Sequence, residues 1–471
     1  MKLTKSDILA LPHFQAVGFD GVKNLKITGV SIDSRTMKEG ELFLAVRGDQ
    51  FDGHNFISKA IEVGAAGIVV ERSWAELNAS MMVSINIPRL IVENTIQTLG
   101  KIANIYRCRF DIPVIAIGGS NGKTTTKEMI RSILGTKYHV LCTEGNLNNQ
   151  IGVPQTLFRL ERKHEVAIVE IGTNHPGEID YLCSVLEPTH GLITNIGREH
   201  LEFFGSLEGV AKSEGELFVW IEKHHGIILV NADDKYLVRL SKKNKKVIRF
   251  GFSARKVSVQ GTIESYNANA QALLRVKPRS KRAFDTTLGV SGEHNAKNAL
   301  AAAAVSLTMK VPPADIQKSL ASFQPAGKRM QMQHIVQVTI LNDTYNANPD
   351  STLAALATLQ AMKPTGKKIA VLGDMLELGN QAKELHRQIG KTAARCGVDI
   401  LLTIGTLSKS LHDAASVGTK AHFDSKSALT EYLIRTVADG DIVLVKGSRG
   451  MKMEEIIVNL SGQLSPNTGI S

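Results

Sequence analysis

The stretch from Pro113 to Leu134, PVIAIGGSNGKTTTKEMIRSIL, constrains the fold more than any other part of the chain. It opens with an apolar run, Pro113 to Ile117, which is typical of a strand buried on both faces of a parallel sheet. From Thr125 on, apolar residues recur at helical spacing, at Met129, Ile130, Ile133 and Leu134. Three glycines lie between the two patterns and allow a tight turn whose N–H groups point at an anion. The stretch therefore predicts a strand, a phosphate-binding loop and a helix.

The loop residues indicate a nucleotide with a metal ion. Lys123 adds a positive charge, and Thr124 adds a hydroxyl suited to Mg²⁺. A strict Walker A motif has glycine where this chain has Ile117, so the match is to a shortened form. A glycine-rich turn with a chance lysine is the alternative, and the flanking strand and helix disfavour it. We expect contacts to ATP from Gly119, Ser120, Asn121, Gly122, Lys123, Thr124 and Thr125.

Size and composition limit the class of protein. A chain of 471 residues is expected to form about two to four domains, and three fit best. The hydrophobic and charged fractions, 43% and 21%, are those of a soluble globular protein. No apolar run is long enough to span a bilayer and the first residues lack a signal-peptide core, so we expect a cytoplasmic protein. The four cysteines show no metal-like spacing and are expected to be reduced thiols.

The net charge of +11 is compatible with nucleic acid or with anionic small molecules. Basic residues cluster at 242–246 and 277–282, but aromatic residues that could stack on bases do not alternate with them. We interpret these clusters as solvated loops and the remaining charge as phosphate-binding sites. No nucleic-acid partner is expected.

Polar side chains follow further apolar runs. Glu170 stands near the end of the run from Val166 to Ile171, and ligands of open parallel sheets gather beyond the carboxyl ends of the strands. Glu170 is therefore a candidate Mg²⁺ ligand beside the phosphate loop, with a helix cap as the alternative. Residues 143–154 follow the phosphate-loop helix, and their amides suit a loop with many directed hydrogen bonds rather than a helix interior. These amides are Asn146, Asn148 and Asn149.

The shortened loop and the string TEGNLNNQIGVP resemble the Mur ligase family, within a superfamily that joins an acid to an amine using ATP. The resemblance covers nearly the whole chain and is weakest at 253–288, where we expect a peripheral antiparallel flap. It implies that residues 1–100 hold the uridine diphosphate of a substrate, through Ser34, Arg35 and Arg47. The three amides would lie beside the same substrate. On its own, Asp33-Ser34-Arg35 indicates only a turn.

The resemblance also implies a second metal site. His200, which follows the strand-like run 191–196, would be one ligand. Many Mur ligases carry a lysine nearby that reacts with CO₂ to form a carbamate, and Glu214 occupies that position here. A glutamate carries the same two-oxygen anionic head on a shorter stem. Lys212 remains the alternative ligand.

Two further positions are implied to contact ATP in the family. Asn295, at the start of an alanine-rich helix, matches the adenine contact, and Arg329 matches an arginine that stabilises the transferred phosphoryl group. Residues 325–329 would form the hinge into a third domain. A lone surface arginine is the alternative for Arg329.

The string from Asn342 to Ser351, NDTYNANPDS, is the most specific in the chain. It implies ATP binding by Asp343 and substrate binding by Asn348. It follows an expected strand at 336–341, and further strand-to-loop units follow at 368–372, 400–404 and 442–445. These alternate with helices and predict a doubly wound C-terminal domain. The Asp-Asn-Pro-Arg string of family members that add a diamino acid is missing.

We therefore predict an α/β protein of three domains: a small substrate-binding domain (1–100), a central phosphate-loop ATPase domain (101–325) and a Rossmann-like domain (326–471). The resemblance implies an ATP- and Mg²⁺-dependent ligase that joins D-alanyl-D-alanine to a UDP-N-acetylmuramoyl tripeptide through an acyl phosphate. Lys123, Glu170, His200 and Arg329 would be catalytic, and Thr124, Glu170, His200 and Glu214 would bind metal. We expect a monomer. Another amide ligase of the superfamily, or a phosphate-loop kinase or nucleic-acid-stimulated ATPase, is the alternative.

Overall fold

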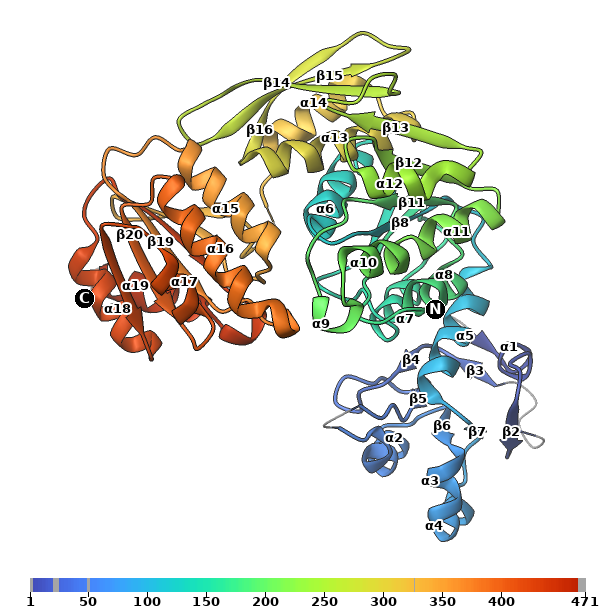
Figure 1. Ribbon diagram of the computed structural model, residues 1–471. Coiled ribbons are helices and arrows are strands. Elements are labelled where there is room, and N and C mark those ends of the chain that lie inside the picture. Colours follow the sequence, from blue (N-terminus) through green and yellow to red (C-terminus); the bar gives the residue numbers. More distant parts are fainter. Residues whose placement is uncertain (1–2, 20–24, 49–50, 326, 465–471) are drawn as a thin grey trace, which may run out of the picture. The chain divides into compact units, whose positions relative to one another are not determined.

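The structure, a computed structural model, describes residues 3–19, 25–48, 51–325 and 327–464 (Figure 1). Helices and strands alternate along these ranges. The strands form sheets of two, five, nine and six strands. The α/β fold class predicted from the sequence is confirmed. Within the described ranges, no helix combines the length and the apolar character needed to cross a membrane.

The N-terminal sheet has the strand order β2-β7-β6-β5-β4. Strands β4 to β7 are parallel, and β2 pairs with β7 in the antiparallel sense. Phe43, Ile57 and Ile68 are fully buried in its core. The elements are β1 (Leu3–Thr4), α1 (Lys5–Leu9), β2 (Phe14–Val17), β3 (Lys26–Ile27), β4 (Val30–Ser31), β5 (Leu42–Leu44), η1 (Gly53–Phe56), α2 (Ile57–Glu62), β6 (Gly67–Glu71), α3 (Arg72–Leu77), α4 (Ala79–Ser84), β7 (Arg89–Val92) and α5 (Thr95–Arg107).

The nine-stranded sheet has the order β16-β15-β14-β13-β12-β11-β8-β10-β9. Its last three strands along the chain are antiparallel to one another and lie at one edge, which confirms the flap expected near 253–288. The strands are β8 (Val114–Gly118), β9 (Val140–Cys142), β10 (Val166–Glu170), β11 (His190–Ile193), β12 (Ile227–Asn231), β13 (Val247–Gly251), β14 (Val259–Tyr266), β15 (Gln271–Pro278) and β16 (Phe284–Ser291).

The helices of this region include α6, which follows the phosphate loop, and α13, which packs against it. Six alanines of α13 are buried, so the small side chains allow close approach. The helices are α6 (Lys123–Leu134), α7 (Gly152–Leu157), α8 (Glu178–Leu186), α9 (Leu201–Phe204), α10 (Leu207–Glu214), α11 (Glu216–Lys223), α12 (Lys235–Leu240), η2 (Ser241–Lys243), α13 (Glu293–Thr308) and α14 (Pro313–Ser322).

The C-terminal sheet has the order β17-β18-β22-β19-β20-β21, with all pairs parallel except the hairpin of β17 and β18. Its elements are β17 (Gln331–Ile335), β18 (Val338–Asp343), α15 (Pro349–Ala361), β19 (Lys368–Gly373), η3 (Gly379–Gln381), α16 (Ala382–Arg395), β20 (Ile400–Ile404), α17 (Ser408–Ala414), β21 (Thr419–Phe423), α18 (Lys426–Thr436), β22 (Ile442–Lys446), η4 (Arg449–Met451) and α19 (Glu454–Leu464).

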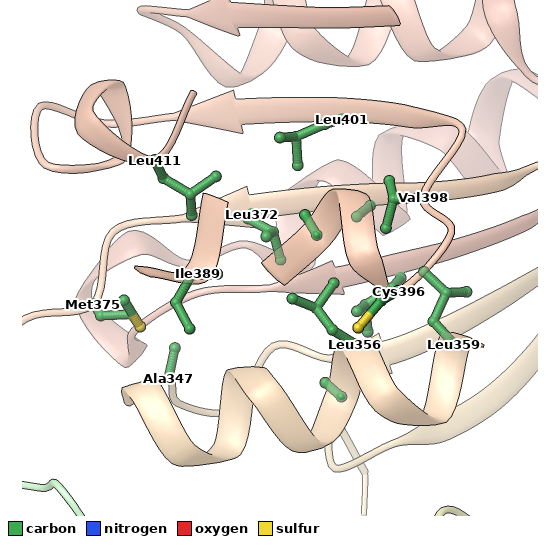
Figure 2. Packing of buried hydrophobic residues seen from close by; sticks show 14 of the residues in the cluster. Ala347, Leu356, Leu359, Leu372, Met375, Ile389, Cys396, Val398, Leu401 and Leu411 are labelled. Atoms are coloured by element: carbon green, nitrogen blue, oxygen red, sulfur yellow. The ribbon is translucent and has the colours of Figure 1, made fainter. Parts of the chain in front are cut away.

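Both faces of this sheet are covered. Leu372 of β19 and Leu401 of β20 lie in one apolar cluster with Leu356 of α15 and Ile389 of α16 (Figure 2). The alternate residues of β19, among them Val371, belong to a second cluster that includes α18 and α19. This period of two with apolar residues on both faces is that of a doubly wound sheet, as predicted for this domain.

Two strand boundaries differ from those expected. The strand expected at 336–341 begins at Val338, because Val336 has a φ of 54° and forms the turn of the β17–β18 hairpin. The strand expected at 191–196 ends at Ile193, and residues 194–196 belong to the loop that follows it. All four cysteines lie in the described residues as thiols outside disulfide bonds, as predicted.

Contacts between residues group the chain into two compact units. The first comprises Met1–Ala116, Tyr138–Gly172 and Glu178–Thr189, and the second comprises Ile117–Lys137, Thr173–Gly177 and His190–Ser471. Both the phosphate loop and the C-terminal sheet lie in the second unit. The residues expected to bind uridine diphosphate lie in the first.

Candidate functional site

The phosphate loop joins β8 to α6. Gly122 is the N-cap of α6 with a φ of 80°, and Gly119 has a φ of 112°. A Cβ atom at Gly119 would lie 2.3 Å from Thr194 Oγ1, and one at Gly122 would lie 2.3 Å from Asn298 Oδ1. Both positions therefore require glycine. The helix begins at Lys123, two residues before the expected Thr125, which places Lys123 and Thr124 in its first turn.

The loop after β11 holds the phosphate loop in shape. Ser120 N donates to Asn195 O at 2.9 Å, and Gly197 N donates to Ser120 Oγ at 2.8 Å. Asn121 O accepts from Thr194 Oγ1 and from Asn195 Nδ2, both at 2.7 Å. The predicted ATP contacts Ser120 and Asn121 thus lie in a network that fixes the backbone before any ligand arrives.

Lys123 lies between loop carbonyls and acidic side chains. Its Nζ donates to Gly119 O and is 3.6 Å from Glu199 Oε2. Burial raises the pKa of the Glu199 carboxyl, and the nearby Lys123 charge opposes that shift. Glu199 was not among the predicted site residues. Its position one residue before His200 in a loop that follows a strand is the signal that could have identified it.

Glu214 lies at the start of the phosphate loop. Its Oε2 accepts from Gly119 N at 2.7 Å. Its Oε1 is buried and has no hydrogen-bond partner among the described residues. Burial raises the pKa of Glu214 to about 7, although Lys123 acts in the opposite direction. Lys212, the alternative ligand, is exposed on the same helix.

His200 has a left-handed backbone, with a φ of 47°, at the N-cap of α9. Its Nδ1 is 2.6 Å from Glu377 Oε2, and its Nε2 is 3.9 Å from Glu199 Oε2. Burial on its own would lower the pKa of His200, but the two carboxylates raise it overall. Like Lys123 and Glu214, His200 therefore belongs to a largely buried, highly charged cluster.

Glu170 and the amide-rich loop lie in the first unit. Glu170, the last residue of β10, accepts from Asn148 Nδ2 at 3.0 Å. The Oδ1 atom of Asn149 accepts from the backbone N–H groups of Ile151 and Gly152 at the start of α7. Asn146 O accepts from Asn148 N at 2.8 Å. Asn148 thus meets Glu170, as expected of neighbouring functional groups, whereas the side-chain oxygen of Asn149 caps a helix.

The predicted uridine diphosphate contacts lie in loops of the N-terminal sheet. Arg35 is exposed and pairs with Asp33 at 2.7 Å, and these hydrogen bonds lower the pKa of Asp33 to about 2. Arg47 Nε is 3.1 Å from Asp52 Oδ2. Ser34, which directly precedes Arg35, is buried. Residues 49 and 50 of the same loop lie outside the described residues.

A buried histidine holds the Arg47 loop. His54 Nδ1 lies 2.6 Å from Asp52 Oδ1, and His54 Nε2 accepts from Glu71 N at 3.1 Å. Asp52 therefore joins the exposed guanidinium of Arg47 to the buried ring of His54. His54 was not among the predicted site residues.

The remaining predicted contacts lie near α13 and the C-terminal sheet. Asn295 is buried, with its Nδ2 donating to Ser291 O at 2.8 Å. Asp343 pairs with the buried Lys446 at 2.6 Å and also accepts from Met330 N. Asn348 Nδ2 donates to Asn121 Oδ1 at 2.9 Å, so two predicted residues meet. Arg329 lies over the ring of Tyr345, with Cζ 3.6 Å from the centroid. Ala326 of the expected hinge lies outside the described residues.

The candidate site contains oxygen atoms that suit a divalent cation. Among the residues described, no three or more His, Cys, Asp and Glu side chains are grouped to hold a metal ion. One observation nevertheless fits a metal ion: Glu214 Oε1 is a buried oxygen without a hydrogen-bond partner among the described residues. Carboxylates and hydroxyls are the hard ligands that Mg²⁺ prefers. Mg²⁺ keeps several non-protein ligands in nucleotide sites, so a small set of protein ligands suffices.

Three family models match the chain. They are described as "Mur ligase family, catalytic domain" over residues 26–107, "Mur ligase middle domain" over 117–306 and "Mur ligase, glutamate ligase domain" over 328–449. The UDP-N-acetylmuramoyl-tripeptide--D-alanyl-D-alanine ligase of Escherichia coli K12 is 36% identical over 439 residues, covering 92% of this chain and 94% of that protein. Its counterpart in Bacillus subtilis 168 is 33% identical, with coverage of 92% and 93%.

Solved structures agree with these matches. MurF from Acinetobacter baumannii has a TM-score of 0.88 at 30% identity and covers 98% of this chain and 99% of its own. MurF ligase from Thermotoga maritima, solved in complex with ADP, has a TM-score of 0.82 at 27% identity, with coverage of 93% and 97%.

The fold and the phosphate loop define a three-part α/β enzyme that uses a nucleoside triphosphate. The relatives make the class narrower: this is an ATP-dependent, ADP-forming amide ligase. The chain belongs to the Mur ligase family.

Proposed function

We propose that this protein joins D-alanyl-D-alanine to a UDP-N-acetylmuramoyl tripeptide with hydrolysis of ATP to ADP, and so completes a peptidoglycan pentapeptide precursor. The observation that carries the proposal is similarity over more than nine-tenths of the chain to ligases named for this reaction. The string from Asn342 to Ser351 supports the same substrate pair. We also propose that the protein is cytoplasmic, where ATP and nucleotide-linked substrates are available, and that it acts as a monomer.

Each of the three expected domains binds a different ligand. Residues 1–100 bind the uridine diphosphate, through Ser34, Arg35 and Arg47. Residues 101–325 bind ATP at the phosphate loop, with Asn295 at the adenine and Asp343 of the following domain also contributing. Residues 326–471 bind the dipeptide. The loops from Asn146 to Asn149, together with Asn348, contact the peptide substrate.

The reaction has two steps. A carboxylate oxygen of the tripeptide attacks the γ-phosphorus of ATP, the bond to the bridging oxygen breaks, and ADP leaves. The amine of D-alanyl-D-alanine then attacks the acyl carbon, loses a proton and expels phosphate, which leaves an amide. Phosphoryl transfer depends mainly on positioning and electrostatics.

Residues of this chain supply that positioning. The loop N–H groups and Lys123 hold the β- and γ-phosphates, and Arg329 stabilises the transferred group. Thr124 and Glu170 would hold one Mg²⁺ ion, and His200 and Glu214 would hold a second. These ions would neutralise charge that develops on the phosphoryl oxygens. Exclusion of water protects the acyl phosphate from hydrolysis.

Glu214, rather than a carbamylated Lys212, serves the second ion in this proposal. Glu214 is buried beside Gly119 with one oxygen unpartnered among the described residues, whereas the Lys212 side chain is exposed. A carboxylate supplied by the chain itself removes the need for CO₂.

The test is phosphate release with ATP, Mg²⁺ and a UDP-muramoyl tripeptide, measured with and without D-alanyl-D-alanine, with the nucleotide product followed by mass. Release that needs both substrates, with a pentapeptide product, is the expected result. Release that is indifferent to the dipeptide, but responds to another amino acid, would assign the chain to a different amide ligase. Release driven by nucleic acid or a hydroxyl acceptor would remove it from this class of reaction.

A further inference from the structure

The C-terminal sheet carries a basic cluster at the carboxyl ends of β18 and β22. Glu454 Oε1 is 2.9 Å from both Lys328 Nζ and Arg449 Nη1. Arg329 lies over the ring of Tyr345, and the Arg449 guanidinium is 6.0 Å from the same ring centroid. Two cations therefore share the Glu454 carboxylate, and Arg329 adds a third cation on the ring of Tyr345. The excess positive charge favours an anionic ligand.

The strand order marks the same place as a ligand site. Strands β19, β20 and β21 follow one another outward, whereas β22 returns to the other side of β19 and lies between it and β18. The direction of winding thus reverses at β19 and β22. In open α/β sheets, ligands bind beyond the carboxyl ends of the strands at such a switch point. Arg449 comes three residues after Lys446, the last residue of β22.

The backbone of Arg449 is anchored, while its side chain is accessible. Arg449 N donates to Asn346 Oδ1 at 3.2 Å, and Asn346 O accepts from Lys446 Nζ at 2.8 Å. Ser448 Oγ accepts from Leu376 N and donates to Ala347 O. The side chain of Arg449 is 57% exposed, compared with 2% for Lys446, which is paired with Asp343. Arg449 is thus the better placed of the two to meet a ligand from solution.

The ion pair of Arg449 does not prevent this. Glu454 also pairs with Lys328, so it keeps a cationic partner when a guanidinium N–H turns to a ligand. A guanidinium presents several N–H donors in a fixed fork and binds a carboxylate through two parallel hydrogen bonds.

We propose that Arg449 binds the terminal carboxylate of D-alanyl-D-alanine, the acceptor in the proposed function on which this inference rests. An extended dipeptide spans about 7 Å, so a carboxylate fixed at Arg449 restricts where the reacting amine can lie. Tyr345 supplies an apolar surface for the alanine methyl groups. Arg329, which lies over the same ring, remains assigned to the phosphoryl group.

The experiment compares two acceptors in four proteins. D-alanyl-D-alanine and D-alanyl-D-alaninamide, which lacks the negative charge, are assayed with the wild-type chain, Arg449→Gln and Arg449→Lys. Arg435→Gln, which alters an exposed arginine on α18 of the same domain, is the matched control. Melting temperatures of all the variants establish that they fold.

The expected result is a rise of about tenfold to a hundredfold in the KM for D-alanyl-D-alanine in Arg449→Gln, since a charge-assisted hydrogen-bond pair is lost. The KM values for ATP and for the UDP substrate should stay within a factor of about two of the wild type. Wild-type protein should prefer the acid to the amide, Arg449→Gln should treat the two acceptors alike, and Arg449→Lys should recover part of the preference. Arg435→Gln should match the wild type.

Three results would overturn the assignment. The first is an unchanged preference for the acid in Arg449→Gln. The second is a rise in the KM for ATP instead of the dipeptide, which would make Arg449 a nucleotide contact. The third is wild-type protein that releases no phosphate with D-alanyl-D-alanine, in which case the proposed function fails and the role of Arg449 fails with it.

Discussion

In the proposed function, the carboxylate of Glu214 takes the place of a carbamylated lysine. The carboxylate is part of the chain, is fully buried, and already accepts a hydrogen bond from the phosphate loop. In the family pattern a lysine must first react with CO₂ to supply an equivalent anion. The two arrangements should therefore differ in their response to bicarbonate and to added carboxylates.

Glu214→Ala should reduce the rate of product formation by roughly a hundredfold, as loss of a group that supports a metal does. Formate or acetate at high concentration should restore part of it, because a free carboxylate can enter the space left. The wild-type rate should be the same in bicarbonate-free buffer. Lys212→Ala, which alters the exposed neighbour, should remain near the wild-type rate. Full activity of Glu214→Ala would remove this carboxylate from the reaction.

His294 should give the folded protein a pH-dependent stability. Burial lowers its pKa to about 4, while Asp343 and Glu293 act in one direction and Lys446 and Lys297 in the other. The unfolded chain binds a proton at this position near pH 6.5, whereas the folded chain does not. Stability should consequently fall as the pH drops below 6.5, with the loss continuing down to about pH 4.

Linkage predicts that this one residue accounts for about 2 kcal/mol of the stability lost between pH 7 and pH 5. The measurement is urea unfolding of wild-type protein and His294→Asn at the two pH values. The asparagine variant should lose less stability than the wild type over the same interval, whatever its stability at pH 7. An equal loss in both proteins would mean that His294 is protonated in the folded state.

The start of helix α6 depends on a single glycine. Gly122→Ala places a Cβ atom 2.3 Å from Asn298 Oδ1 on a backbone with a φ of 80°. We expect the free energy of unfolding to fall by about 1 to 3 kcal/mol and the KM for ATP to rise, because the loop N–H groups shift. Steady-state kinetics and urea unfolding measure the two effects.

Gly397→Ala is the matched control for Gly122→Ala. Gly397 also has a positive φ, of 67°, but an added Cβ would meet nothing within 4 Å. It should lower stability modestly through backbone strain and leave the KM for ATP unchanged. If both variants weaken ATP binding equally, the close approach of Gly122 to Asn298 is not what positions the phosphate loop.

Elements with continuous apolar runs could be predicted from the sequence. Strands β8, β10 and β20 are entirely buried, and their mostly apolar sequences indicate this burial. Strand β21, TKAHF, was missed because it lies at the sheet edge, where polar residues are tolerated. The β17–β18 hairpin was missed because its turn places Val336 at a positive φ, which β-branched residues rarely adopt.

The sequence could predict which residue types of the candidate site stand at strand ends. It could not predict which of these residues pair with one another through ion pairs or hydrogen bonds. The phosphate loop follows from local spacing alone. Lys446, Arg449 and Tyr345 also stand at or just after the ends of strands. Which of them is buried in an ion pair depends on contacts between residues about a hundred positions apart. Sequence periodicity carries no information on such pairs.

At the scale of the whole molecule, the two substrates should act on different compact units. The phosphate loop lies in the second unit, whereas Ser34, Arg35 and Arg47 lie in the first. A ligand that binds only the folded state slows the local opening of the segments it contacts. Hydrogen exchange with each ligand alone should therefore give two separate patterns of protection.

With a non-hydrolysable ATP analogue and Mg²⁺, amide exchange should slow at 118–126 and 291–299. With the UDP-muramoyl tripeptide alone, it should slow at 30–37 and 44–48. Chelation of Mg²⁺ should weaken the first pattern and leave the second, because the proposed metal ions bind together with the nucleotide. Lys123→Ala is the control, since it should remove protection by the analogue but not by the tripeptide. Protection of residues 30–48 by the ATP analogue alone would show that these loops serve the nucleotide instead, and would reverse the assignment of the first unit.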